Sequence, residues 1–137
     1  MRTLMLSLNY ISNGDFFMST LLKPNPSEVL MKAFNNACEA LKLGTKERAQ
    51  LLGVNRATLN RNVQRGFSPE SKTWELQLYF IRLYRSLYAV AGGDSEFMSH
   101  WFQTENTALN GVPASLCLKI EGLFRINQYL DAMRGKV

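Results

Sequence analysis

The chain has 137 residues, enough for one ordinary domain or for two very small domains that share a core. Its 46% hydrophobic and 11% aromatic content excludes a disordered tail, and no apolar run approaches the roughly 20 residues of a membrane span. The net charge of +5 is concentrated, because residues 46–72 hold six basic and two acidic residues, a net of +4. Such a segment suits phosphate binding, although a solubilising face explains the charge equally well.

Residues 1–26 are predicted to form an N-terminal extension with little regular order. Their start imitates a signal peptide, but the apolar run Thr3–Leu8 is short and lacks a small-residue cleavage site. Met18 is an alternative start codon, which would leave residues 1–17 outside the folded protein. Pro24 and Pro26 predict a non-helical hinge into the first helix.

The two cysteines, Cys38 and Cys117, lie far apart in the sequence and have no CxxC or histidine-flanked spacing. This pattern favours neither a zinc site nor a disulfide framework. Cys38 falls in an apolar helical stripe, so we expect it in the core. We expect no metal or other cofactor, and a reducing, cytoplasmic compartment.

Three helices are predicted before residue 66. The first runs from Ser27, as its N-cap, to Gly44, because the apolar residues between them recur at three- and four-residue spacing. A short helix, capped by Thr45, ends at Gly53, and a third covers residues 56–65.

Ser68 and Pro69 predict the start of a long helix over about 70–91. Its apolar stripe is wider than packing against one neighbouring helix requires, which is typical of the central helix of a small helical fold. Further helices are predicted over 95–102, from Pro113 to 121 or 122, and over 123–133, with Gly122 either breaking the last two or only weakening one continuous helix. No strand is predicted. The expected fold is therefore all-α, with an N-terminal helical part joined by the long helix to a small helical C-terminal domain.

The spacing from Thr45 to Gln64 is typical of a helix-turn-helix. Ala49 supplies the small residue where the two helices cross, and Gly53 supplies a left-handed turn without steric cost. Val54 and Leu59, backed by Leu52 and followed in register by Val63, are predicted to hold the second helix against the domain. Each feature is weak alone, but all of them fall in register within the basic segment.

The outward face of this element predicts DNA binding. Arginine suits guanine, asparagine and glutamine suit adenine, and alanine suits the thymine methyl group. The residues predicted to face base edges are Asn55, Arg56, Ala57, Asn60, Arg61 and Gln64. Thr45 and Lys46 are predicted to meet a phosphate. The alternative is a charged, solvated face on a helical hairpin.

Several segments of the chain resemble the Xre/MbcA/ParS antitoxin family, and together they span residues 45–137. The matching segments are Leu52-Gly53-Val54-Asn55-Arg56-Ala57-Thr58-Leu59, Gly66-Phe67-Ser68-Pro69-Glu70-Ser71, Trp101…Asn106…Leu109-Asn110-Gly111-Val112-Pro113, Glu121-Gly122-Leu123 and Tyr129–Val137. Residues 1–26 have no counterpart, and Trp74-Glu75-Leu76 departs from the small or charged residues that relatives often place there.

The resemblance implies an Xre-like helix-turn-helix domain over 27–92 and a toxin-binding domain over 93–137. It implies an antitoxin of a type II toxin-antitoxin system that neutralises a RES-domain, NAD-consuming toxin and represses its own operon. Residues matching the toxin-binding pattern are Trp101, Asn106, Leu109, Gly111, Pro113 and Gly122. Residues matching the terminal segment, which in relatives lies near the toxin's active-site cleft, are Arg134, Gly135, Lys136 and Val137.

Three alternatives bear on function. An enzyme is not expected, because His100, the single histidine, has no recognisable serine or cysteine partner and no glycine-rich loop follows a strand. A stand-alone transcriptional repressor would need the C-terminal half only for dimerisation. A helix-turn-helix used mainly for assembly would have its basic face partly covered. We expect a homodimer, since palindromic operators pair two recognition helices, and the stripe on helix 70–91 is one possible interface.

Overall fold

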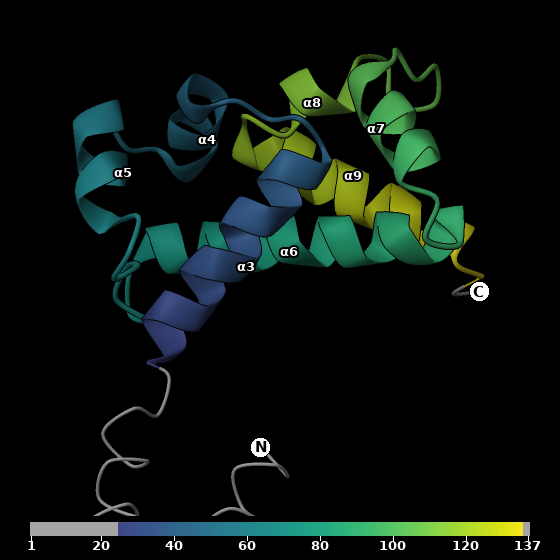
Figure 1. Ribbon diagram of the computed structural model, residues 1–137. Coiled ribbons are helices and arrows are strands. Elements are labelled where there is room, and N and C mark those ends of the chain that lie inside the picture. Colours follow the sequence, from purple (N-terminus) through teal and green to yellow (C-terminus); the bar gives the residue numbers. More distant parts are fainter. Residues whose placement is uncertain (1–24, 136–137) are drawn as a thin grey trace, which may run out of the picture.

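The computed structural model describes residues 25–135 (Figure 1). The predicted extension over 1–26 therefore falls almost wholly outside the described residues, as do Met18, Lys136 and Val137. Seven helices are present in the described range: α3 (Pro26–Ala40), α4 (Thr45–Leu52), α5 (Arg56–Asn62), α6 (Lys72–Ala91), α7 (Ser95–Gln103), α8 (Pro113–Leu116) and α9 (Ile120–Met133). Residues 25–135 contain no strand, only an isolated bridge, and the all-α prediction is confirmed.

The long helix α6 is the centre of the fold. It packs against α3, α4, α7 and α9, and Figure 1 shows it running across the molecule with α3 crossing it. The fully buried ring of Phe80 on α6 makes edge contacts with Phe34 of α3 and Phe102 of α7, at centroid distances of 5.5 and 6.2 Å. One hydrophobic core therefore joins the helices on both sides of α6, as its wide apolar stripe predicts.

Helices α6 and α9 run parallel to each other. Asn127 Nδ2 donates to the carbonyl oxygen of Tyr79 at 3.2 Å, and Arg134 Nη1 donates to Ser86 Oγ at 3.2 Å. Because residue numbers rise together along both helices, the two share one direction. Any surface between them is therefore built from distant parts of the sequence.

Two helices begin at other residues than predicted. Asn25, rather than Ser27, caps α3, and its Oδ1 accepts from the Ser27 amide at 2.8 Å. Pro26 is then the first helical residue, a position where the missing N–H costs nothing. Ser71, rather than Ser68, caps α6 by accepting from the Trp74 amide at 3.1 Å.

The boundary between α3 and α4 also differs from the prediction. Lys42, with φ of 60°, makes the left-handed turn after α3, whereas Gly44 has φ of −79° and serves as the N-cap of α4. Thr45 is therefore the first helical residue and not the cap. Helix α5 stops at Asn62, and the turn after it closes with the Gly66 amide donating to the Asn62 carbonyl at 2.8 Å.

Neither alternative for Gly122 is right, because Gly122 neither separates two helices nor lies in one helix that continues from α8. The chain leaves helical geometry between α8 and α9, at Lys119, which has φ of −115° and ψ of 145°. Gly122 lies buried inside α9. A glycine is needed there because the end of α8 crosses directly over it, which a sequence pattern does not reveal.

Candidate functional site

The helix-turn-helix has the predicted turn. Gly53 ends α4 with φ of 69°, and its amide donates to the Gln50 carbonyl at 3.1 Å. The Val54 amide donates to the carbonyl of Ala49 at 3.0 Å, and Ala49 is buried at the crossing. Leu59, only 4% exposed, anchors α5 in the core. The local geometry of the turn therefore follows from these residues.

Val63 does not hold the second helix. Its side chain is 42% exposed, because α5 ends at Asn62 and the chain turns away before the next apolar position could face the core. Leu52 and Leu59 are buried, and the partly buried Val54 packs against the same core. Helix α5 is thus fixed through its first half, and its C-terminal end lies at the surface.

All eight residues predicted to meet DNA are exposed. They are Thr45, Lys46, Asn55, Arg56, Ala57, Asn60, Arg61 and Gln64. Asn55 also caps α5, with its Oδ1 accepting from the Thr58 amide at 2.8 Å, which leaves its amide NH₂ group for a base edge. Arg61 Nη2 donates to Thr58 Oγ1 at 3.2 Å, which holds the guanidinium along the helix.

The cations of the basic segment have different roles. Arg48 is half-buried and donates from Nε to the Leu43 carbonyl at 2.7 Å, so it supports the loop before α4. Lys72 forms an ion pair with Glu75, with Nζ and Oε2 3.3 Å apart. Arg65, which the sequence motif did not select, is exposed beside α5. Its charge was visible in the sequence, but it lies outside the motif's register.

The segment from Asn106 to Gly111 forms a tight loop. The Asn106 amide donates to the Gly111 carbonyl at 2.9 Å, and the Gly111 amide donates to the Asn106 carbonyl at 3.2 Å. Asn106 Oδ1 also accepts from the Leu109 amide at 3.1 Å. Arg125 of α9 donates to the Leu109 carbonyl at 2.8 Å. This polar network fastens the loop to the domain.

Part of the predicted toxin-binding set lies inside the domain. Leu109 and Pro113 are buried in the core of this chain. Gly111 is half-buried, and a β-carbon there would lie 3.1 Å from Leu116 Cδ2. Together with Asn106, these residues shape the domain. An interface at this place would use exposed loop positions such as Glu105 and Asn110 instead.

Trp101 and Arg134 lie at the surface in different ways. The half-buried Trp101 ring stacks on Tyr129 of α9, with centroids 6.3 Å apart and planes at 20°. Arg134 is exposed, and its bond to Ser86 ties the beginning of the C-terminal segment to α6. Gly135 follows with φ of 77°. His100 is exposed on α7.

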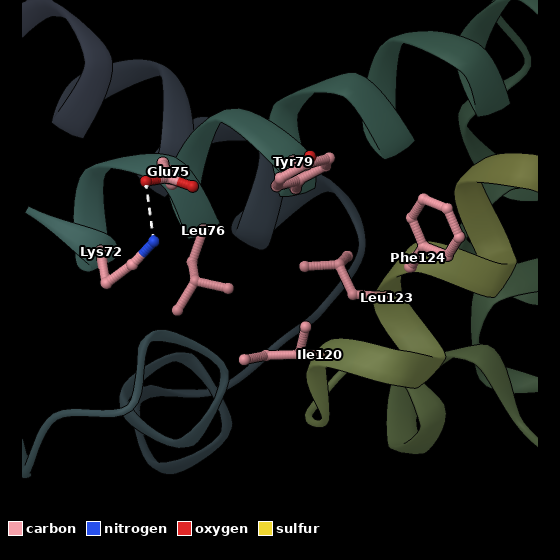
Figure 2. Close-up of a pocket in the computed structure, with 7 residues that line it drawn as sticks. All are labelled: Lys72, Glu75, Leu76, Tyr79, Ile120, Leu123 and Phe124. Carbon is pink, nitrogen blue, oxygen red and sulfur yellow. Dashed lines mark hydrogen bonds and ion pairs between the residues drawn. The ribbon is translucent and has the colours of Figure 1, made fainter.

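Figure 2 shows a hollow between α6 and α9 that the motifs did not predict. Its volume is about 470 Å³, and its lining residues are Lys72, Glu75, Leu76, Tyr79, Ile120, Leu123 and Phe124. Ile120 is 73% exposed and Phe124 51% exposed, so two large apolar side chains next to the hollow face solvent. No sequence signal could have found the hollow, since the docking of α9 beside α6 creates it.

Comparison with protein families agrees with this architecture. Residues 20–82 match the antitoxin Xre-like helix-turn-helix domain, and residues 86–136 match the antitoxin Xre/MbcA/ParS C-terminal toxin-binding domain. The chain belongs to the Xre/MbcA/ParS antitoxin family. A search among curated proteins found no match.

This antitoxin thus carries a DNA-binding helix-turn-helix and a toxin-binding domain. The two family matches meet inside α6, the helix that contributes to both halves of the core. Between residues 25 and 135, no helix is long and apolar enough to cross a membrane.

Proposed function

We propose that this antitoxin neutralises a RES-domain toxin that consumes NAD, and that it represses its own operon as a homodimer. The observation that carries the DNA-binding part is the exposed face of α5, which presents Arg56 and Arg61 to solvent while buried Leu59 anchors the helix. Its DNA and toxin partners imply that the protein acts in the cytoplasm.

The chemistry of the α4–α5 surface supports operator binding. Exposed Lys46 and Arg65 would neutralise phosphates, and Arg56, at the first turn of α5, would enter the major groove first. The recognition residues sit on a short helix anchored by the core. Their positions are therefore set before DNA binds, which lowers the cost of ordering them.

A gel shift with DNA from upstream of the antitoxin's own gene tests this part. We expect R56A/R61A to lose binding, while a control that removes two exposed cations elsewhere, R85A/K119A, keeps it. Circular dichroism would verify that both variants fold. Unchanged binding by R56A/R61A would reject α5 as the recognition helix.

The C-terminal segment supports toxin neutralisation. Arg134 and Lys136 make residues 134–137 basic, and a basic segment suits a cleft that binds the anionic pyrophosphate of NAD. We expect deletion of residues 134–137 to weaken rescue of cells that express the cognate toxin. Full rescue by the truncated protein would show that residues 134–137 are not needed for neutralisation. It would not contradict toxin binding by other parts of the domain.

A stand-alone repressor is the second candidate, because α5 alone would suffice for it. Co-purification with the product of the neighbouring gene separates the two candidates. Capture of a RES-domain protein supports the antitoxin, and a repressor that purifies alone from the intact operon supports the alternative.

A further inference from the structure

Helix α6 carries an exposed stripe that the functions proposed above leave unused. Glu75, Leu78, Tyr79 and Arg82 follow the i, i+3, i+4, i+7 spacing that places side chains on one helical face. Leu78 is 45% and Tyr79 40% exposed, and the four residues line a shallow hollow of about 270 Å³. We name these four residues the α6 stripe. It adjoins the larger hollow in Figure 2, with Glu75 and Tyr79 common to both.

The charges of the α6 stripe are ordered along the helix. Glu75 lies at one end and Arg82 at the other, with the apolar Leu78 and Tyr79 between them. Each of the two charged side chains forms an ion pair within its own chain: Glu75 with Lys72, and Arg82 with Asp131 of α9. These pairs hold the two charged side chains at the rim of the apolar centre.

We propose that the α6 stripe is the homodimer interface, with a second copy of α6 packed antiparallel across a two-fold axis between Leu78 and Tyr79. Under that symmetry Glu75 meets Arg82 of the partner subunit, and the contact occurs twice. Leu78 meets Tyr79 of the partner subunit, which removes both exposed apolar side chains from water. The inference rests on the proposed function, because it assigns a surface to the homodimer proposed there.

The charge order favours a second copy over another partner. A stripe that runs from anion through apolar residues to cation is complementary to itself when reversed. At each end of the interface, the Lys72–Glu75 pair of one subunit would lie beside the Arg82–Asp131 pair of the other. Charges of opposite sign would therefore be neighbours across the interface. The same symmetry brings Lys72 toward Arg85 of the partner subunit at the outer edge, where water and salt screen the two cations.

The arrangement also suits DNA. The axis lies between six and seven residues from the start of α6, so the two helix starts would be about 20 Å apart at 1.5 Å per residue. Figure 1 shows α5 beside that end of α6. The two recognition helices would therefore lie farther apart than the α6 starts, toward the spacing of about 34 Å between half-sites one turn apart.

Charge reversal provides the decisive experiment. In an E75R dimer both ends of the α6 stripe are cationic, and in an R82E dimer both are anionic, so each variant repels itself. When the two variants are mixed, cations face anions at both ends. In analytical ultracentrifugation of the full chain without DNA, we expect dimerisation of each variant to weaken roughly tenfold or more, and an equimolar mixture to recover dimers.

Failure of the mixture to recover, or wild-type dimerisation by either variant alone, would overturn the proposal. L78S and Y79S should also weaken the dimer. Y88S, which removes a 52% exposed aromatic side chain from the same helix but outside the α6 stripe, should leave it intact. If Y79S keeps the dimer but no longer co-purifies with the toxin, the surface belongs to the toxin and the dimer assignment is wrong.

The test is independent of operator binding. Loss of DNA binding by R56A/R61A leaves the dimer unchanged, because α5 does not contribute to the α6 stripe. A wild-type chain that is monomeric yet binds its operator would overturn the interface and the proposed homodimer, but not operator binding by α5. A dimer that recovers on mixing but binds no operator would overturn the operator proposal alone.

Discussion

Gly122 of α9 lies directly against the backbone of Leu116 at the end of α8. A β-carbon on Gly122 would lie 2.6 Å from the carbonyl carbon of Leu116 and closer still to its oxygen. Backbone atoms cannot move aside as a flexible side chain can. This contact sets how closely the short helix α8 sits on α9, and through α8 it positions the loop that ends at Gly111.

Replacing Gly122 with alanine should therefore destabilise the protein. At an exposed helical position, alanine is more stable than glycine by about 1 kcal/mol. Here we expect the opposite sign, a loss of about 2 kcal/mol in the free energy of unfolding, because the methyl group overpacks a closed contact. Urea denaturation followed by circular dichroism measures the difference. Q128A, at an exposed position of α9, is the control, and a stabilised G122A would contradict the contact.

Gly66 and Gly53 should respond differently to alanine. Both have positive φ, 76° and 69°, but a β-carbon on Gly66 would lie 2.6 Å from the carbonyl carbon of Ser27, whereas Gly53 faces open space. We expect G53A to cost about 1–2 kcal/mol from backbone strain alone. G66A should cost clearly more, since α3 must also shift. Equal thermal shifts for the two variants would show that packing at Gly66 is not limiting.

Replacing Gln77 with methionine should stabilise the core. Gln77 is fully buried, its Nε2 contacts the sulfur of Met31 at 3.0 Å, and its Oε1 has no hydrogen-bond partner among the described residues. Methionine has a similar shape and leaves no polar atom unpaired. We expect a gain of about 1 kcal/mol in urea denaturation. Q50M, on the exposed face of α4, should be neutral, and a destabilised Q77M would indicate that the amide has an unseen partner.

The two cysteines should resist alkylation while the protein is folded. Burial raises the pKa of Cys38 and of Cys117 from 9.0 to about 12, so almost no thiolate exists at pH 8. Iodoacetamide at that pH should label neither residue in native protein, and both residues in urea. Mass spectrometry reads the result directly. Rapid labelling of native protein would show that the region around the modified cysteine opens readily.

The same shifts predict how stability depends on pH. Because the folded-state pKa lies above the unfolded value, each buried thiol stabilises the fold fully below pH 9. That contribution, up to a few kcal/mol for each thiol, is lost as pH rises from 9 toward 12. Urea midpoints measured at pH 8 and pH 10.5 should therefore fall more for wild type than for C38A/C117A. Parallel curves would contradict the assignment, since lysines and tyrosines titrate in both proteins.

The residues responsible for the turn between α4 and α5 lie close together in the sequence. A left-handed Gly53 and a small Ala49 are requirements of a few neighbouring residues, so their spacing predicted the helix-turn-helix and its exposed face. The sequence does not decide which residue caps the N-terminus of α3 or of α6. Asn25 and Ser27 are both good caps, as are Ser68 and Ser71, and local preference cannot choose between neighbours.

The toxin-binding half depends on contacts that no local pattern predicts. Its motif identifies the family and predicts Leu109 as a contact residue, whereas Leu109 is buried and Arg125, sixteen residues away, donates to its carbonyl. The role of Gly122 likewise depends on α8 crossing α9. The hollow beside Tyr79 exists only because α9 docks parallel to α6. The sequence alone thus determined the family, the helices and the recognition face, since these depend on neighbouring residues. Only the tertiary structure decided which side chains the core covers and which surfaces remain for partners, because burial depends on contacts between distant segments.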